Sequence, residues 1–121
     1  MNKRKLAEAW IHLQDLPQDS TEAEKYMWSA EEINLLALRS PSDCWDVVLE
    51  ILSITDDDWI ITNLGAGPIE NMLAFKPEIT ISMIENEYTN NSKLQAAIKN
   101  TWKNIIPDEV WDRLSEMKSN M

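Results

Sequence analysis

Hydrophobic side chains recur at helical spacing along almost the whole chain, and this pattern predicts an all-α protein. Glycine occurs only twice, and no long run alternates Val, Ile or Thr with polar residues, so little of the sequence is typical of a sheet. The first predicted helix runs from about Lys3 to Gln14, and Pro17 ends the segment. Its apolar side chains share one face: Leu6, Ala9, Trp10 and Leu13.

A second helix is predicted from about Thr21 to Leu38, where Ser20 or Thr21 is placed to cap the first turn. Ser29 and Glu32 have the spacing of a capping box, which would begin a new helix inside this span. The sequence therefore leaves open whether the span is one helix or two.

The strongest helix start is Ser40-Pro41-Ser42-Asp43, because a cap residue precedes a proline that suits the first helical position. We expect a helix from Pro41 to about Ser53. Its two faces differ in character, since the apolar face holds Trp45, Val48, Leu49 and Leu52, and the opposite face holds Asp43, Asp46 and Glu50. The pattern thus predicts three carboxylates in a row on one side of this helix.

Thr55 is predicted to cap a short helix that runs from Asp56 to about Ile61 and opens with three aspartates. Carboxylates are favourable at the positive end of a helix dipole. Asp56, Asp57 and Asp58 therefore have a structural explanation that competes with any binding role.

The two glycines stand one residue apart and directly before a proline, which indicates a break between two helices. Gly65 is expected to adopt left-handed backbone that closes one helix, Gly67 to allow a sharp turn, and Pro68 to begin the next helix. Glu70 would then lie in the first turn of that helix. Phosphate binding is the less favoured explanation, since it usually requires a strand before a longer glycine-rich loop.

Residues 78–87 are assigned to a helix, although Ile79, Ile81 and Met83 also alternate as they would in a strand. Asn91 or Ser92 is expected to cap a further helix that continues to Ile106. Its core-facing side chains would be Leu94, Ile98, Trp102 and Ile105.

The last predicted helix follows Pro107 and is capped by Asp108. Its apolar residues are Val110, Trp111, Leu114 and Met117. Together the segments predict one domain over residues 1–121, a compact irregular bundle of about six to seven short helices. An array of helical hairpins with eroded repeats is the alternative.

The net charge of the chain indicates which kind of partner it could bind. The net charge is −10 and the isoelectric point is near 4.4, which argues against nucleic acid because phosphate binding needs a concentrated basic surface. No lysine or arginine occurs from Ser40 to Phe75, whereas seven carboxylates fall in that window. The imbalance favours a basic protein as partner, and solubility alone is the competing explanation.

Candidate chemistry is sparse. Cys44 is the only cysteine and has apolar neighbours, so we expect a reduced, buried thiol. His12 is the only histidine and has no second ligand at zinc spacing, so we expect no metal and no cofactor. No segment is typical of a signal peptide or a membrane span, which predicts a cytoplasmic protein without membrane association.

The run Leu-Gly-Ala-Gly-Pro-Ile-Glu-Asn-Met-Leu, residues 64–73, resembles a Leu-Gly-Ala-Gly-Pro-Leu-Glu-Asp-Leu-Leu signature of small, uncharacterised bacterial proteins. Its flanks are also similar, at Pro41, Trp45, Ile84-Glu85, Trp102 and Arg113. The chain departs after Leu73, where members of that family often have a basic residue, His and Gly. The resemblance implies a bacterial, intracellular protein and no assigned activity.

Glu70 has two candidate roles. The structural hypothesis pairs its carboxylate with backbone amides at the glycine corner or with Arg113, and groups both with Gly65, Gly67 and Pro68 as a structural motif. The functional hypothesis places Glu70 in a binding surface, which would consist of the candidate partner-binding residues Asp43, Asp46, Glu50, Asp56, Asp57 and Glu70.

Two function classes remain, and in neither is the chain an enzyme. The preferred one is an acidic module that binds a basic protein, most concretely a bacterial immunity protein that occludes a nuclease-type toxin. The alternative is an adaptor or regulatory subunit that binds through an apolar patch, or a homo-oligomeric structural protein. An enzyme using Glu70 or Glu85 is least favoured, and the oligomeric state does not follow from the sequence.

Overall fold

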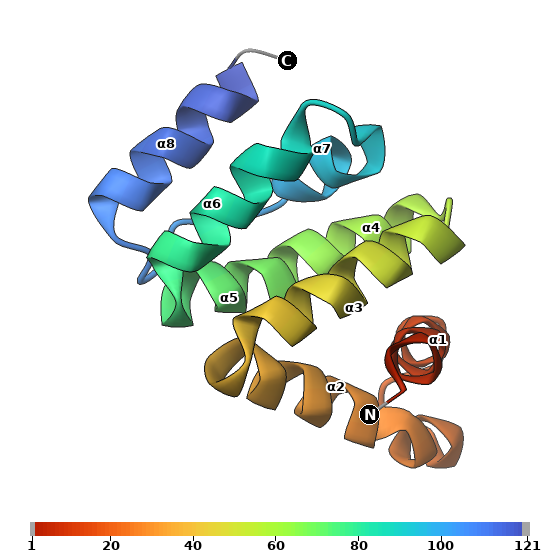
Figure 1. Cartoon of the computed structure of the whole chain (residues 1–121). Coiled ribbons are helices and arrows are strands. Elements are labelled where there is room, and N and C mark those ends of the chain that lie inside the picture. Colours follow the sequence, from red (N-terminus) through yellow and green to blue (C-terminus); the bar gives the residue numbers. More distant parts are fainter. Residues whose placement is uncertain (1, 120–121) are drawn as a thin grey trace.

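A computed structural model describes residues 2–119, and within this range all regular secondary structure is helical (Figure 1). The prediction of an all-α fold is confirmed. The elements are α1 (Lys3–Gln14), α2 (Thr21–Arg39), α3 (Pro41–Ile54), α4 (Asp58–Leu64), the π-helical turn η1 (Gly65–Ile69), α5 (Glu70–Phe75), α6 (Pro77–Tyr88), α7 (Ser92–Ile98) and α8 (Asp108–Ser119).

The predicted cap of α2 is confirmed, whereas Ser40, before α3, makes no side-chain capping bond and donates its hydroxyl to Asp43 at 2.8 Å. The Ser20 hydroxyl accepts the N–H of Ala23 at 3.0 Å and caps α2. The span from Thr21 to Arg39 is a single helix. Ser29 begins no new helix within it, since this residue is buried and its hydroxyl donates to the Tyr26 carbonyl of the same helix. The cap of α4 is Asp57 in place of Thr55, with the Trp59 N–H as its donor at 2.8 Å.

The predicted corner at the glycines is wrong, because the chain stays helical through it. Gly65 has φ −67° and ψ −45°, and no glycine has positive φ. α4, η1 and α5 therefore form one continuous helix from Asp58 to Phe75 (Figure 1). The π-helical turn accommodates Pro68, which lacks an N–H and would disrupt a regular α-helix at this point.

Gly65 has a packing reason instead of a conformational one. A Cβ atom at this position would stand 1.9 Å from the carbonyl oxygen of Ala97, so glycine is what allows α7 to approach this closely. At Gly67 a Cβ would meet no atom within 4 Å. The two glycines of the motif therefore differ, and only the first is needed for packing.

The second correction concerns α7, which ends at Ile98 and does not continue to Ile106. Asn100 and Thr101 bond back to the helix through their side chains, to the carbonyls of Ala96 at 3.0 Å and Ile98 at 2.8 Å. Residues 99–107 form an irregular loop. Trp102 and Ile105, which were expected to face the core, lie on the surface.

Residues 78–87 are helical, so the strand alternative is wrong. Thr80, on α6, is fully buried and donates its hydroxyl to the Met72 carbonyl of α5 at 3.1 Å. This bond satisfies a polar group inside the core.

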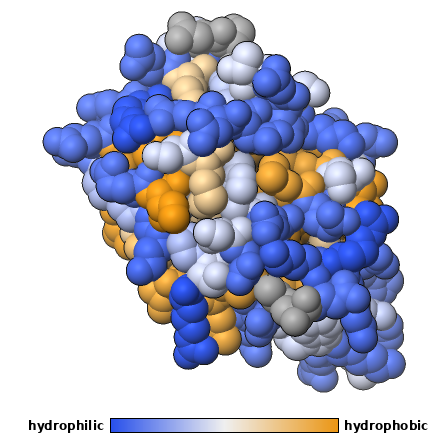
Figure 2. Space-filling model, viewed as in Figure 1, coloured by the Kyte–Doolittle hydropathy of each residue, from blue (hydrophilic) through white to orange (hydrophobic). Residues whose placement is uncertain are grey.

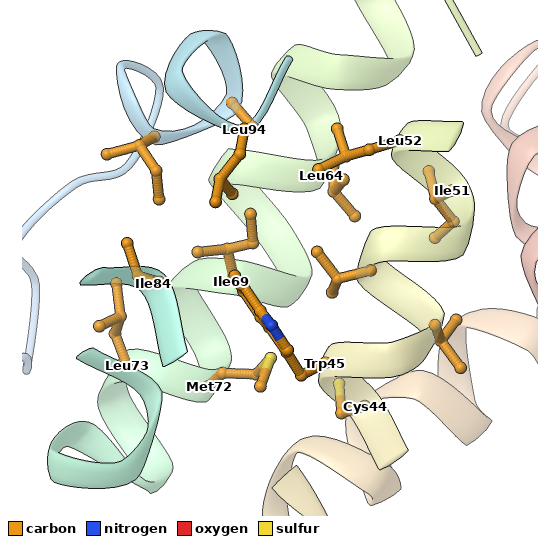
Figure 3. Packing of buried hydrophobic residues seen from close by; sticks show 14 of the residues in the cluster. Cys44, Trp45, Ile51, Leu52, Leu64, Ile69, Met72, Leu73, Ile84 and Leu94 are labelled. Carbon is orange, nitrogen blue, oxygen red and sulfur yellow. The ribbon is translucent and has the colours of Figure 1, made fainter. Parts of the chain in front are cut away.

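One contiguous hydrophobic core connects helices from both ends of the described chain, from Leu6 on α1 to Leu114 on α8. The continuous α4–α5 helix runs through the middle of the molecule, with α1 to α3 on one side and α6 to α8 on the other (Figure 1). Figure 3 shows Trp45 of α3 reaching toward Ile69 and Met72 of the central helix. Burial of such aromatic and aliphatic side chains is the main stabilising contribution.

None of the helices in residues 2–119 is both long and apolar enough to cross a lipid bilayer. The face seen in Figure 2 is largely hydrophilic, with hydrophobic side chains showing in smaller patches between the charged ones.

Candidate partner-binding surface

Helix α3 brings Asp43, Asp46 and Glu50 together on one exposed face as predicted, but the start of α1 lies against them. The Lys3 ammonium is 3.2 Å from Asp43 and 2.5 Å from Asp46. The Arg4 guanidinium is 2.7 Å from Glu50 and 3.1 Å from Glu8 of its own helix. The acidic row is therefore partly neutralised within the chain, and no spacing in the sequence indicates these ion pairs.

We call Glu8, Asp43, Asp46 and Glu50, with Lys3 and Arg4, the acidic cluster. Four carboxylates against two cations leave two negative charges, and the four carboxylate side chains are 34 to 60% exposed. The cluster thus remains an anionic surface in contact with solvent.

Contacts within the cluster shift the pKa values of Asp43, Lys3 and Arg4. A hydrogen bond from Ser40, followed by the contact with Lys3, lowers the pKa of Asp43. Hydrogen bonds to Asp46 and Asp43 raise the pKa of Lys3, and bonds to Glu50 and Glu8 raise that of Arg4. The pairs lie in solvent, so their contribution to stability is small.

Asp56 and Asp57 serve helix ends. Asp56 is 91% exposed and pairs with Lys93 at 2.7 Å, and this contact lowers its pKa. Lys93 also donates to the carbonyls of Leu52 at 3.0 Å and Thr55 at 2.8 Å, where α3 ends. Asp57 caps α4. Both aspartates thus have structural partners inside the chain.

The carboxylate of Glu70 holds the loop between α7 and α8. Its Oε1 accepts the backbone N–H of Trp102 at 2.6 Å, and its Oε2 accepts the Asn104 amide at 2.8 Å. Asn104 has φ 41°, a left-handed conformation that asparagine tolerates better than most residues. Glu70 does accept a backbone amide, but from a loop 32 residues away, not from the glycines.

Arg113 pairs with Glu85 and lies 3.5 Å from Glu78, both on α6. Arg113 therefore does not pair with Glu70, as one hypothesis expected, but with these two glutamates. Its ion pair with Glu85 joins α8 to α6.

We call residues 99–107 the clamped loop, because further contacts fix it at both ends. Lys118 donates to the Thr101 carbonyl at 3.4 Å, and Lys103 pairs with Asp108 at 2.7 Å. Ile106 is buried and anchors the loop in the core. The exposed fractions of Trp102 and Ile105 are 71% and 74%, higher than for any other large hydrophobic residue in the described part of the chain.

Residues 16–121 match a family of unknown function (DUF6869). The chain belongs to this family. The matched range contains the α3 carboxylates, Glu70 and the clamped loop, whereas Lys3, Arg4 and Glu8 precede it. No curated protein and no solved structure matched the chain. Membership of DUF6869 supplies no activity, so the site must be interpreted from its own geometry.

A shallow groove of about 460 Å³ runs beside Gly67 in this DUF6869 protein and is lined largely by uncharged side chains. The amide of Asn71 donates to Asn34 at 2.9 Å, and that of Asn63 donates to Gln14 at 3.0 Å. Because Gly67 has no side chain, the groove stays open at this point.

The two lone reactive side chains have ordinary packing roles. Cys44 is fully buried, as expected, and burial raises the pKa of its thiol to about 12. His12 packs edge-on against Tyr26, with ring centroids 4.5 Å apart.

Proposed function

We propose that this chain is a binding module for a basic protein, in its most concrete form a bacterial immunity protein that occludes a nuclease-type toxin. The observation that supports this most is the acidic cluster, where four carboxylates that are 34 to 60% exposed share two cations. The net charge of −10 has the same sign as this cluster.

A surface of this kind acts on the encounter between proteins. Its field attracts a positively charged partner before contact and accelerates association, and salt weakens that attraction. Basic side chains of the partner would compete with Lys3 and Arg4 for the same carboxylates. When a cation of the partner replaces Lys3 or Arg4, the carboxylate keeps an ion-pair partner. The cost of removing that carboxylate from water is therefore largely compensated.

The test is a pull-down from the producing bacterium with three forms of the chain, followed by measurement of association rates with the recovered protein. The triple variant Asp43→Asn/Asp46→Asn/Glu50→Gln should slow association, and wild-type association should slow as salt rises. The control is Glu24→Gln/Glu31→Gln/Glu32→Gln, which removes the same number of negative charges from α2, outside the acidic cluster. Glu24 and Glu31 are exposed and Glu32 is half-buried. Recovery of no protein, or of a partner whose binding ignores salt, would refute the proposal.

The clamped loop favours a second candidate, an adaptor that binds through an apolar patch. Trp102 and Ile105 supply exposed apolar surface without any charge on their own side chains. Under this alternative the acidic-cluster triple variant binds the partner as the wild type does.

A further inference from the structure

We propose that a groove lined by side-chain amides is a binding site for a neutral sugar or a short oligosaccharide. The site consists of the 460 Å³ groove beside Gly67 and a neighbouring hollow of about 300 Å³, which share Gln14 and Asn63 in their walls. We call the two together the amide groove. No residue of the acidic cluster lines it, so the inference is independent of the proposed function.

The walls of the amide groove bring carboxamides from four helices to one place. They are Gln14 at the end of α1, Asn34 on α2, Asn63 on α4 and Asn71 on α5. In one pair the Asn71 amide donates to Asn34 at 2.9 Å, and in the other Asn63 donates to Gln14 at 3.0 Å. A carboxamide carries donors and an acceptor on one planar group, which suits neighbouring hydroxyls that both donate and accept.

The paired amides keep bonding capacity for a ligand. Within residues 2–119 no protein group bonds the Asn34 amino group or the Oδ1 atoms of Asn63 and Asn71. The Gln14 amino group donates to the Trp10 carbonyl at 3.1 Å, which fixes the orientation of its pair. The remaining donors and acceptors are thus held in place before a ligand arrives, and such pre-organisation increases affinity.

A tryptophan supplies a flat apolar surface in the adjoining hollow. Trp59 lines this hollow and is 59% exposed. Its indole N–H donates to the Gln14 carbonyl at 3.1 Å, which restricts the orientation of the ring. The C–H face of a sugar ring can pack on such an aromatic face while the hydroxyls reach polar groups. The amide groove therefore offers both kinds of contact that a sugar uses.

The lack of charge in the groove disfavours other ligand classes. Although 26% of the chain is charged, none of the described residues that line the groove is. A phosphate ligand would lack Lys or Arg, and an organic cation would lack a carboxylate or an aromatic cage. Peptide recognition commonly uses a sheet edge, a broad apolar groove, a row of aromatic rings or an arginine cluster, and this groove has one exposed ring, that of Trp59.

The test is an NMR titration of the isotope-labelled full chain with glucose, galactose, mannose, N-acetylglucosamine and their di- and trisaccharides. At least one of these sugars should shift the side-chain amide signals of the groove and the indole N–H signal of Trp59 until saturation. Hexose phosphates, adenosine and a set of uncharged peptides are titrated in parallel and should bind more weakly. No saturable shift with any sugar, or tighter binding of a phosphate, nucleoside or peptide, would overturn the proposal.

Two substitutions with matched controls locate the site. Trp59→Ala and Asn71→Ala should each weaken binding of the best sugar about tenfold, through loss of the stacking surface and of one or two hydrogen bonds. The controls Trp28→Ala and Asn86→Ala remove an exposed tryptophan and an exposed amide outside the groove, and should leave the affinity unchanged. Circular dichroism of each variant checks that the helices persist.

Equal affinity in Trp59→Ala, Asn71→Ala and wild type would place the sugar elsewhere and refute the amide groove, as would loss of binding in either control. The acidic-cluster triple variant separates this proposal from the proposed function. It should bind the sugar as the wild type does, whereas Trp59→Ala should associate with a basic protein partner as fast as wild type.

Discussion

The two glycines of the central motif provide a sharp test, because the structure gives alanine a much larger cost at Gly65 than at Gly67. At Gly65 the added Cβ would stand 1.9 Å from the Ala97 carbonyl oxygen and 2.8 Å from its carbon. Both are backbone atoms, so relief requires α7 to move away from the central helix. Overpacking of this kind destabilises by about 1–3 kcal/mol.

At Gly67 the same substitution removes backbone freedom from the unfolded chain without a clash with another part of the fold. The position is helical, its φ is not positive, and outside its chain neighbours and its own helix backbone no atom lies within 4 Å of the new Cβ. The gain of about 0.5–1 kcal/mol is offset by the contact of the Cβ with the ring of Pro68, so alanine should change the free energy of unfolding by less than about 1 kcal/mol.

Urea denaturation followed by circular dichroism measures both free energies, and a thermal scan gives a second reading. For a chain of this length each kcal/mol shifts Tm by about 3–6 °C, so Gly65→Ala should melt clearly below Gly67→Ala. A left-handed corner would make both substitutions destabilising. A loss of stability in Gly67→Ala as large as that in Gly65→Ala, or a neutral Gly65→Ala, would refute the continuous helix and its contact with α7.

Three further outcomes are expected. Cys44 should react with a thiol reagent at pH 8 only as fast as the fold opens, since its thiol is buried and its pKa is raised to about 12; rapid labelling of the native protein contradicts this. Glu70→Ala should increase amide hydrogen exchange in residues 99–107 and leave α1 to α3 unchanged, which mass spectrometry of peptides can localise. The lowered pKa of Asp56 means that its ion pair with Lys93 stabilises above the unfolded value near 3.8 and is lost as pH falls through the lower folded value. Acid unfolding curves of Asp56→Asn should accordingly show a weaker loss of stability over that window than wild type.

Features set by neighbouring residues were accessible from the sequence. The Ser20 cap, the start of α3 at Pro41 and the row of three α3 carboxylates need only helical spacing and capping chemistry. The all-α class follows from the same local signals, which leave little of the chain without a helical pattern.

Features set by distant residues were not accessible. Glycines close before a proline usually mark a turn, so the sequence indicated a helix break at Gly65. The reason for a glycine inside a helix at this position is the close approach of Ala97, which is 32 residues away in the chain. Trp102 and Ile105 have helical spacing with Leu94, so periodicity assigned them to the core, whereas Asn100 and Thr101 end the helix earlier. Lys3 lies 40 residues from Asp43, and spacing within one helix gives no sign that the two would pair.

The central motif has a consistent explanation once its contacts are followed to one segment. Gly65 admits the Ala97 backbone, and Glu70 binds Trp102 and Asn104, so both residues receive the chain between positions 97 and 104. Residues five apart in a regular α-helix point about 140° away from each other, since each residue turns about 100°. The wider π-helical turn rotates less per residue and brings Gly65 and Glu70 toward a common face. The π-helical turn at Pro68 thus aligns the residues that dock α7 and clamp the loop, and it connects the motif to the exposed Trp102.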